Sequence, residues 1–389
     1  MKSNYKKIGD YVCQVNNRNT DLKITNLKGI NINKEFMPSV ANINGTDLSK
    51  YKIVKKEQFA FNPMHVGRDK VLPISLWRYD EEIIVSPAYT VLEITDTSIL
   101  NPEYLMMWFE RSEFDRNCWF TTDNSVRGGF NWDDFCNIVI PLIDLDTQNK
   151  IVEQYFNLKR LLEECHTKNG LIDQSLQNLY KKFISDYVDE NQSIEDLRPL
   201  GDYCSLITKG TTPKKMDNNY FDESIIYIKG TSIDSENFID LNKVSYIDSS
   251  THSDLKRSQI KPLDILYTIT GTLGNFALVP QTIPQSNTNQ NVAIIRVNST
   301  AISSYYLYFL FTGNWHNKFL IENTQQAVQA NLNLKMLNDM LIPILPETIF
   351  KSLNLSLMKL CEYKLLNINK MFFIEKLQEV LLQEMSVLQ

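Results

Sequence analysis

The stretch that decides the fold is FNWDDFCNIVIP, residues 130–141, because it aligns without a gap on LNLKMLNDMLIP, residues 332–343. Both stretches carry Asn in the second position and end on Ile-Pro, at an offset of 202. Tyr104 and Tyr306 keep this offset, whereas a Gly-Asp-Tyr triplet near the start of the chain recurs at an offset of 192. Self-similarity in this order indicates a tandem duplication whose second copy carries about ten extra residues in its first part.

Each copy begins with about 100 residues of short β-type runs separated by turn signals, which predicts two irregular β-rich domains. Asn101 followed by Pro102 predicts the start of a helix that closes the first of these domains. The runs are residues 59–61, 82–86 and 89–94 in the first copy, and 225–228, 265–270 and 292–297 in the second.

A heptad pattern follows Pro141, with apolar residues spaced alternately four and three. The 33 residues from Ile151 to Phe183 would form a helix of about 50 Å at about 1.5 Å per residue, too long for the interior of one small domain. The predicted seam positions are Ile151, Tyr155, Leu158, Leu162, Cys165, Asn169, Ile172, Leu176, Leu179 and Phe183.

The second copy predicts a matching long helix after Pro343, but Lys364, Asn367 and Gln378 interrupt its apolar seam. Polar seam residues commonly fix the register and the partner of a helix pair, so we expect the two long helices to pack against each other. The alternative is that each is an ordinary amphipathic helix packed on its own domain. The apolar positions of this second seam are Leu353, Leu357, Leu360, Met371, Ile374, Leu381 and Met385.

Length and composition set bounds on the class of protein. The chain has 389 residues, 43% hydrophobic and 22% charged, which is typical of a folded protein with two or three domains. No apolar run is long enough to span a membrane and the start does not read as a signal peptide, so we expect a cytoplasmic protein. The six cysteines lie far apart with no C-x-x-C pair, and we expect them to be reduced and mostly buried.

Motifs of the common enzyme classes are absent from the sequence. We find no phosphate-binding loop, no dinucleotide-binding loop, no H-E-x-x-H and no G-x-S-x-G. Residues 62–65, Asn-Pro-Met-His, begin like the motif with which amino-methyltransferases hold a flipped adenine, but the second proline and the aromatic residue are missing. We therefore interpret Asn62 and Pro63 as a turn and predict no catalytic residue and no metal site.

The order of these features, found twice, resembles the specificity (S, HsdS) subunit of type I restriction-modification systems across essentially the whole chain. The resemblance rests on LGDY (200–203) leading to KGTTP (209–213), on LN through IP (332–343), and on VSPAY (85–89). Such subunits usually continue Ile-Pro with a further proline and a Glu-Gln pair. The first copy here keeps only the glutamine, Gln148, and the second has Pro346-Glu347-Thr348 with no glutamine. These departures put the helix starts in doubt and would weaken one methylase-contact surface.

This resemblance implies an α+β fold in which two target recognition domains are each followed by a long helix, the helices packing as an antiparallel coiled coil. We expect a first recognition domain at 1–143, a first long spacer helix and linker at 144–198, a second recognition domain at 199–345 and a second spacer helix at 346–389. The protein would have no catalysis or cofactor of its own. It would read an asymmetric bipartite site in double-stranded DNA and dock two methyltransferase subunits. Restriction subunits could join through the complex.

S-adenosylmethionine, ATP and magnesium would then belong to those partner subunits. Two alternative functions remain compatible with the sequence. One is an S-like protein-binding scaffold without DNA readout, and the other is an enzyme with an unfamiliar site.

The net charge of −6 does not by itself indicate DNA binding, so local clusters must provide it. Arg suits guanine in the major groove, and Asn or Gln suits adenine. The candidate DNA-binding residues are Arg68, Lys70, Arg78 and Arg127 in the first domain, and Lys209, Thr211, Thr212, Lys214, Lys215, Lys229, Asn289 and Gln290 in the second.

Overall fold

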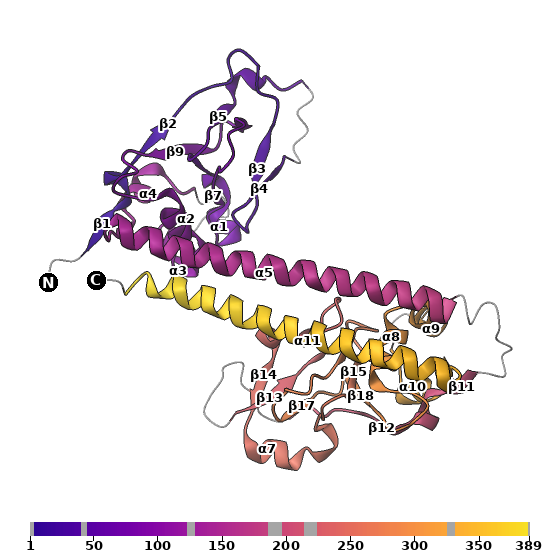
Figure 1. Cartoon of the computed structure of the whole chain (residues 1–389). Coiled ribbons are helices and arrows are strands. Elements are labelled where there is room, and N and C mark those ends of the chain that lie inside the picture. The colour runs from indigo at the N-terminus through magenta and orange to yellow at the C-terminus, as the bar shows by residue number, and fades with distance from the viewer. Residues whose placement is uncertain are drawn as a thin grey trace. The chain divides into compact units, whose positions relative to one another are not determined.

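The computed structural model describes residues 4–39, 45–122, 129–185, 197–213, 224–324 and 331–387. The chain divides into two compact units, the first formed by Met1–Leu162 with Ile374–Gln389 and the second by Glu163–Phe373. Each of the two long helices, α5 Leu145–Tyr180 and α11 Glu347–Glu384, therefore contributes to both units (Figure 1). This division rests on contacts between residues. It does not test the four domain ranges predicted from the sequence, which stay predictions.

The first unit is built on a four-stranded antiparallel sheet with strand order β2-β9-β6-β7. Two further strand pairs, β3-β4 and β5-β8, extend this unit, and β1 pairs with β10. Its strands are β1 Tyr5–Lys7, β2 Val12–Val15, β3 Lys28–Ile30, β4 Phe36–Pro38, β5 Lys52–Val54, β6 Phe59–Phe61, β7 Ile74–Leu76, β8 Ile83–Val85, β9 Thr90–Ile94 and β10 Val139–Pro141. Its short helices are α1 Val66–Asp69, α2 Pro102–Glu110, α3 Ser112–Phe120 and α4 Trp132–Asn137.

The second unit repeats this plan with the sheet order β12-β18-β15-β16 and adds a three-stranded sheet, β14-β13-β17. Its strands are β11 Leu197–Pro199, β12 Cys204–Lys209, β13 Ile225–Ile228, β14 Ser245–Ile247, β15 Ile265–Thr268, β16 Phe276–Leu278, β17 Ser286–Thr288, β18 Val292–Val297 and β19 Leu341–Pro343. Its short helices are α7 Ser249–Asp254, α8 Ser304–Phe311, α9 Asn314–Thr324 and α10 Leu334–Asn338. All six β-type runs predicted from the sequence contain an observed strand.

The duplication is visible in matching hydrogen bonds. The Tyr104 hydroxyl donates to the Pro141 carbonyl at 3.1 Å, and the Tyr306 hydroxyl donates to the Pro343 carbonyl at 2.9 Å. Both tyrosines are buried. In each unit the closing helix is thereby tied to the Ile-Pro strand that leads into the long helix.

The repeated Gly-Asp-Tyr triplet forms a tight turn that passes close to a short helix. A Cβ at Gly9 would lie 2.6 Å from the Cβ of Cys136, and a Cβ at Gly201 would lie 2.1 Å from Oδ1 of Asn338. Only glycine allows this approach without a shift of the neighbour. The triplet is therefore a packing feature of both copies.

The glutamine kept at the start of α5 explains how that helix begins. Gln148 is fully buried, and its amide donates to the carbonyls of Ile99 (2.9 Å) and Ile143 (2.8 Å) while accepting from the N–H of Asn101 (2.8 Å). Asp144 caps the first turn by accepting from a backbone N–H at 2.9 Å. The first long helix is thus anchored to its domain by side-chain hydrogen bonds.

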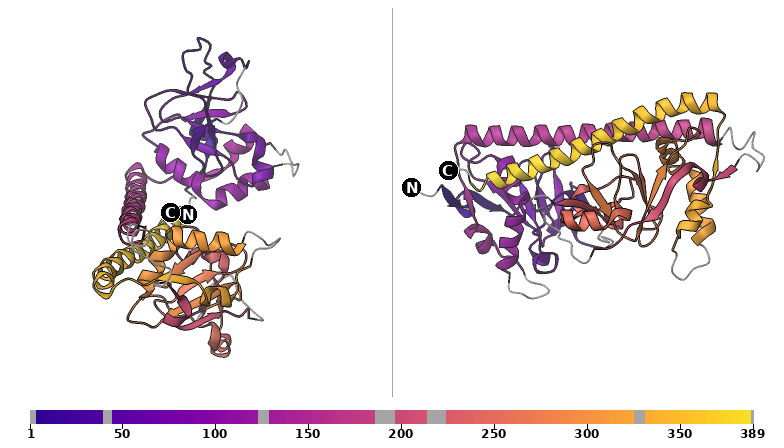
Figure 2. Two further views of the ribbon diagram at one scale, coloured as in Figure 1. Left: turned by 90° about the vertical axis from the view of Figure 1, so that its right-hand side faces the viewer. Right: turned by 90° about the horizontal axis from the view of Figure 1, so that it is seen from below.

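Within the second unit the C-terminal half of α5 and the N-terminal half of α11 lie side by side in opposite directions (Figures 1 and 2). Ile172 and Leu176 of α5 and Leu353 and Leu357 of α11 are buried in one core cluster with the sheet and α8. Leu360, one of the predicted seam positions, is half-buried beside the fully buried Cys361.

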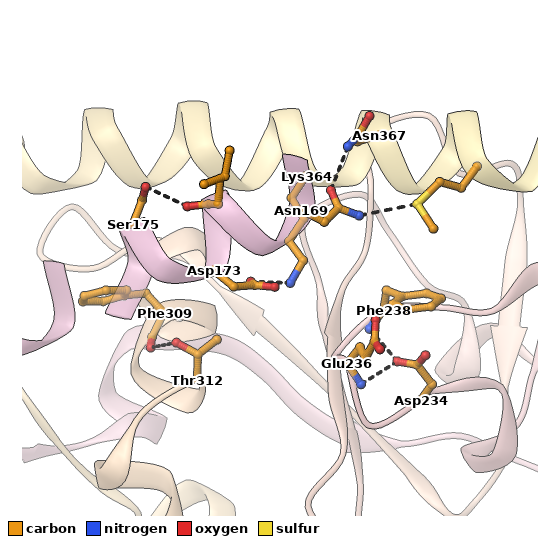
Figure 3. Close-up of polar contacts among 12 residues, drawn as sticks. Asn169, Asp173, Ser175, Asp234, Glu236, Phe238, Phe309, Thr312, Lys364 and Asn367 are labelled. Carbon is orange, nitrogen blue, oxygen red and sulfur yellow. Dashed lines mark hydrogen bonds and ion pairs between the residues drawn. The ribbon is translucent and has the colours of Figure 1, made fainter. Parts of the chain in front are cut away.

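Polar seam residues of α11 find partners on α5 (Figure 3). The Lys364 ammonium lies 2.6 Å from the Asp173 carboxylate, and the Asn367 amide donates to Asn169 Oδ1 and to the Cys165 carbonyl, both at 2.9 Å. Since buried polar groups cost free energy unless paired, these contacts favour one register.

Within the first unit the seam residues Ile151 and Tyr155 are buried against the domain together with Met385 at the end of α11. Leu158 and Leu162 are half-buried, and Leu381 and Leu382 pack against the same cluster. The predicted α+β fold, with two β-rich domains each followed by a long helix, is confirmed.

The cysteines and the hydropathy of the helices were also predicted from the sequence. All six cysteines are free, and Cys118, Cys165 and Cys361 are buried, so half of them rather than most are buried. In the part of the chain that the structure describes, no helix is long and apolar enough to cross a membrane.

Candidate nucleic-acid interface

The clearest polar cluster lies in the second unit, at the turn of residues 210–213 that follows β12. Its first residue, Gly210, donates its N–H to the Val292 carbonyl at 3.1 Å. A Cβ there would lie 2.1 Å from the Thr288 carbonyl oxygen. Glycine therefore lets the 210–213 turn press against the segment between β17 and β18.

Several side chains from distant parts of the sequence meet at this turn. Arg257 donates to the Thr211 hydroxyl at 3.0 Å, and the Thr212 hydroxyl contacts the Gln290 amide oxygen. The Tyr227 hydroxyl donates to the Thr211 carbonyl at 3.0 Å, and burial raises the pKa of Tyr227 to about 12, so it stays protonated as a donor.

Arg257, Gln290 and the preceding Lys209 are exposed. The 210–213 turn thus presents a guanidinium, an ammonium and an amide to solvent, with two threonine hydroxyls beside them. These groups can donate to phosphates and to base edges.

Two of the other predicted DNA-binding residues in this unit, Asn289 and Lys229, are half-buried. Asn289 is half-buried and accepts from the Asn291 N–H at 3.2 Å, so it shapes the turn. Lys229 is half-buried and caps a short 3-10 turn. Lys214 and Lys215 lie outside the described residues.

Arg257 is not among the DNA-binding residues that the sequence predicts. It stands in a Lys-Arg pair in a short 3-10 turn, which a charge scan would notice, but its partner Thr211 is 46 residues away. Nothing in the local sequence connects the pair to the 210–213 turn.

The candidates in the first unit do not form one cluster. Arg68 is exposed and forms a two-point ion pair with Asp69 at 2.7 and 2.8 Å, and Lys70 lies 4.8 Å from the centre of the Trp119 ring. Arg78 binds Glu103 of α2 through two contacts of 2.7 Å. Arg127 lies outside the described residues.

Arg78 is therefore engaged as a link between the sheet edge and α2, whereas Lys70 lies beside Trp119 near the end of α3. Phe120, the last residue of that helix, is 87% exposed, and no sequence signal distinguished it from a core aromatic. Trp119, which is 37% exposed, lies beside the Lys70 ammonium, and exposed aromatic rings beside cations are common on nucleic-acid-binding surfaces.

The turn at residues 62–65 is confirmed as a structural element. Asn62 caps a short 3-10 helix by accepting from the Met64 N–H at 3.0 Å. Across the residues that the structure describes, no group of three or more His, Cys, Asp or Glu side chains could hold a metal ion.

The comparisons with known proteins agree with this reading. Residues 195–349 match the family model of the type I restriction modification DNA specificity domain. In this part the chain is similar to that specificity domain. The resemblance to type I specificity subunits is confirmed.

Similarity extends to one curated protein and to solved structures. The type I restriction enzyme EcoBI specificity subunit of Escherichia coli is 27% identical over 106 residues, which are 27% of this chain. The match spans 22% of that subunit, about a fifth of its length.

The type I restriction-modification S subunit of M. genitalium superposes with a TM-score of 0.59 at 13% identity, covering 98% of this chain and 95% of that one. The HsdS subunit of Thermoanaerobacter tengcongensis gives a TM-score of 0.39 at 12% identity, covering 98% and 95%. At 13% identity, the superposition on the M. genitalium subunit supports the fold alone.

Proposed function

We propose that this chain is the DNA sequence-recognition subunit of a type I restriction-modification complex and has no catalysis of its own. The observation that carries the proposal is the 210–213 turn with Arg257 and Gln290, which lies within the matched specificity domain. The exposed guanidinium, ammonium and amide groups at this turn can donate hydrogen bonds to the phosphates and base edges of double-stranded DNA.

Two domains of one sheet topology but different sequence would each read one half of an asymmetric, bipartite site. The long helices, of 36 and 38 residues, would set the gap between the halves. Two methyltransferase subunits would dock on the chain, and restriction subunits would join through the complex. The chain would carry no cofactor, and S-adenosylmethionine, ATP and magnesium would be bound by those partners.

The first test is sequencing of adenine methylation in source DNA with and without the gene. We expect methylation at a split motif, two short blocks around a fixed gap, to disappear when the gene is removed. Unchanged methylation would favour the protein-binding scaffold, and methyl transfer or cleavage by the purified chain alone would favour an enzyme.

The second test replaces Arg257 with alanine in the complex with its methyltransferase. Loss of one guanidinium contact to DNA should weaken binding by about 1 to 3 kcal/mol, and affinity should fall steeply with salt. Lys351→Ala is the matched control because Lys351 is an exposed cation on α11 that pairs within its own helix, at 2.5 Å from Glu347. Equal effects of the two variants would argue against the 210–213 turn as a DNA contact.

A further inference from the structure

Strand β17 supports the 210–213 turn and the glutamine beside it. The Thr211 N–H donates to the Thr288 carbonyl at 3.1 Å, which attaches the turn to the end of this strand. Gln290 stands two residues beyond that end. All three residues of β17 are buried, so the strand is a rigid support for the polar groups at the turn.

The short 3-10 turn that carries Arg257 is attached to the same strand. The amide of Asn287, in the middle of β17, donates to the Leu255 carbonyl at 3.1 Å and to the Ser258 hydroxyl at 2.9 Å. Asn287 and Ser258 are both fully buried. Arg257 therefore projects to solvent from a backbone whose position is set by buried hydrogen bonds.

The Arg257 guanidinium is positioned by one hydrogen bond and keeps further donors. Its Nη2 donates to the Thr211 hydroxyl at 3.0 Å, and its other N–H groups can still donate. Among the described residues, Arg257 forms no ion pair with a carboxylate. Arg78 of the first unit differs, because two contacts of 2.7 Å with Glu103 engage its guanidinium. Arg257 can thus present two N–H groups side by side to one base.

Gln290 also presents donors, although glutamine generally suits adenine. A glutamine reads adenine by accepting from the N6 amino group through Oε1 while donating to N7 through Nε2. Here Oε1 accepts from the Thr212 hydroxyl. Because this bond orients the amide with Oε1 toward the turn, the Nε2 hydrogens are the groups left for DNA.

A surface of donors favours a base edge of acceptors. In the major groove guanine shows two acceptors, N7 and O6, whereas adenine places its N6 amino donor beside N7. Cytosine shows an amino donor, and thymine shows one acceptor beside a methyl group. Two adjacent N–H groups on Arg257 therefore match guanine, and against adenine one of them would meet another donor.

We infer that Arg257, positioned by Thr211, selects a guanine in the half-site that the second domain reads. Gln290 supports this choice with its Nε2 donor and does not select an adenine. This inference rests on the proposed function, because it names one base of the site that the function requires. Arg257 is the specificity-determining residue at that base, and Thr211 is a positioning residue.

The test is sequencing of adenine methylation in cells that carry the full complex with variants of this chain. Arg257→Gln replaces adjacent donors with a donor and an acceptor, so one G·C pair of the motif should become A·T or relax. We expect the preference for guanine over adenine there to fall by at least about tenfold. The matched control is Lys256→Gln, which removes the neighbouring exposed cation and should leave the motif unchanged.

The role of Thr211 has a test of its own. Thr211→Val keeps the shape of the side chain and removes the hydroxyl that holds Arg257, so it should relax the motif at the same base pair and at no other. Thr211→Ser keeps the hydroxyl and should restore the wild-type motif. A residue that only stabilised the fold would lower methylation evenly at every site, and serine would not restore one base pair selectively.

A wild-type motif with no G·C pair in either block, or an Arg257→Gln variant with the wild-type motif, would overturn the inference. Methylation at a split site would in both cases still support the proposed function. If Arg257→Gln abolished methylation, binding to duplexes with each base pair substituted in turn would decide. Equal weakening on all of these duplexes would make Arg257 a phosphate contact and overturn the inference. Absence of gene-dependent methylation in the wild type would overturn the proposed function itself.

Discussion

Gly210 controls the position of the 210–213 turn at the scale of a single residue. A methyl group there would collide with backbone oxygens of Thr288 and Asn289, at 2.1 and 2.4 Å, and backbone cannot move aside as a flexible side chain can. We expect Gly210→Ala to destabilise the second unit by about 1 to 3 kcal/mol and to weaken DNA binding by displacing Thr211.

Thermal unfolding and a binding titration would check this outcome. Gly230→Ala is the matched control, because a Cβ at Gly230 would meet its nearest neighbour at an ordinary 3.7 Å. If Gly210→Ala bound DNA normally, the close approach would have no role in recognition.

His316 provides a second residue-scale prediction, one of pH dependence. It is buried, its Nε2 lies 2.7 Å from the Tyr267 hydroxyl, and burial lowers its pKa to about 4 from an ordinary value of 6.5. Between these values the unfolded chain binds a proton that the folded chain does not. Stability is therefore complete above about pH 6.5 and falls as the pH drops toward 4, by up to about 3 kcal/mol.

Urea unfolding at about pH 7 and about pH 5 would measure this loss. His316→Gln, which keeps a partner for Tyr267 without titrating, should flatten the pH dependence. His166→Gln on the exposed face of α5 should leave it unchanged. A wild-type slope retained in His316→Gln would assign the titration to other groups.

At the scale of elements, the contact between Lys364 and Asp173 shows how the long helices are matched within the second unit. The Lys364 side chain is 9% exposed and that of Asp173 is 46% exposed. Removing the Asp173 carboxylate leaves the buried Lys364 ammonium without its counter-ion. Replacing Lys364 instead leaves the Asp173 carboxylate, which water can still solvate. We expect Asp173→Ala to destabilise by about 2 kcal/mol and Lys364→Met to be neutral or stabilising.

Chemical denaturation of the two single variants and the double variant would test this asymmetry. The double variant should resemble Lys364→Met, because no buried charge is left without its partner. If Lys364→Met were the more harmful change, the pair would be a net source of stability.

Much of the element-scale structure could be predicted from the sequence. The strands within the six predicted β-type runs, the capped helix after Asn101 and both long helices depend on local patterns such as alternation, capping residues and heptads. The roles of Lys364 and Asn367 could be predicted only as interruptions of a seam, because their partners lie almost 200 residues earlier in the chain. Separation along the sequence also hid the contact of Arg257 with Thr211, 46 residues away, and the ion pair of Arg78 with Glu103, 25 residues away.

At the scale of the whole molecule, the two ends of the described chain meet in the first unit. The Tyr5 hydroxyl donates to the Ser386 carbonyl at 2.7 Å, and Met385 is fully buried in the core cluster that contains Ile151 and Tyr155. The last turn of α11 is therefore part of the first β-rich domain's core, although the second copy encodes it. The first unit should not reach full stability until residues 381–387 have been made.

Met385→Ala tests this dependence because it removes a buried side chain, at a cost of about 2 to 5 kcal/mol, from the first unit alone. We expect faster hydrogen exchange in β2, β6 and β9 but unchanged exchange in β12, β15 and β18, measured by mass spectrometry on the full chain. Val387→Ala is the matched control two residues on, where the side chain is 72% exposed. Equal acceleration in both sheets would mean that the units unfold together, and the end of α11 would then stabilise the molecule as a single cooperative structure.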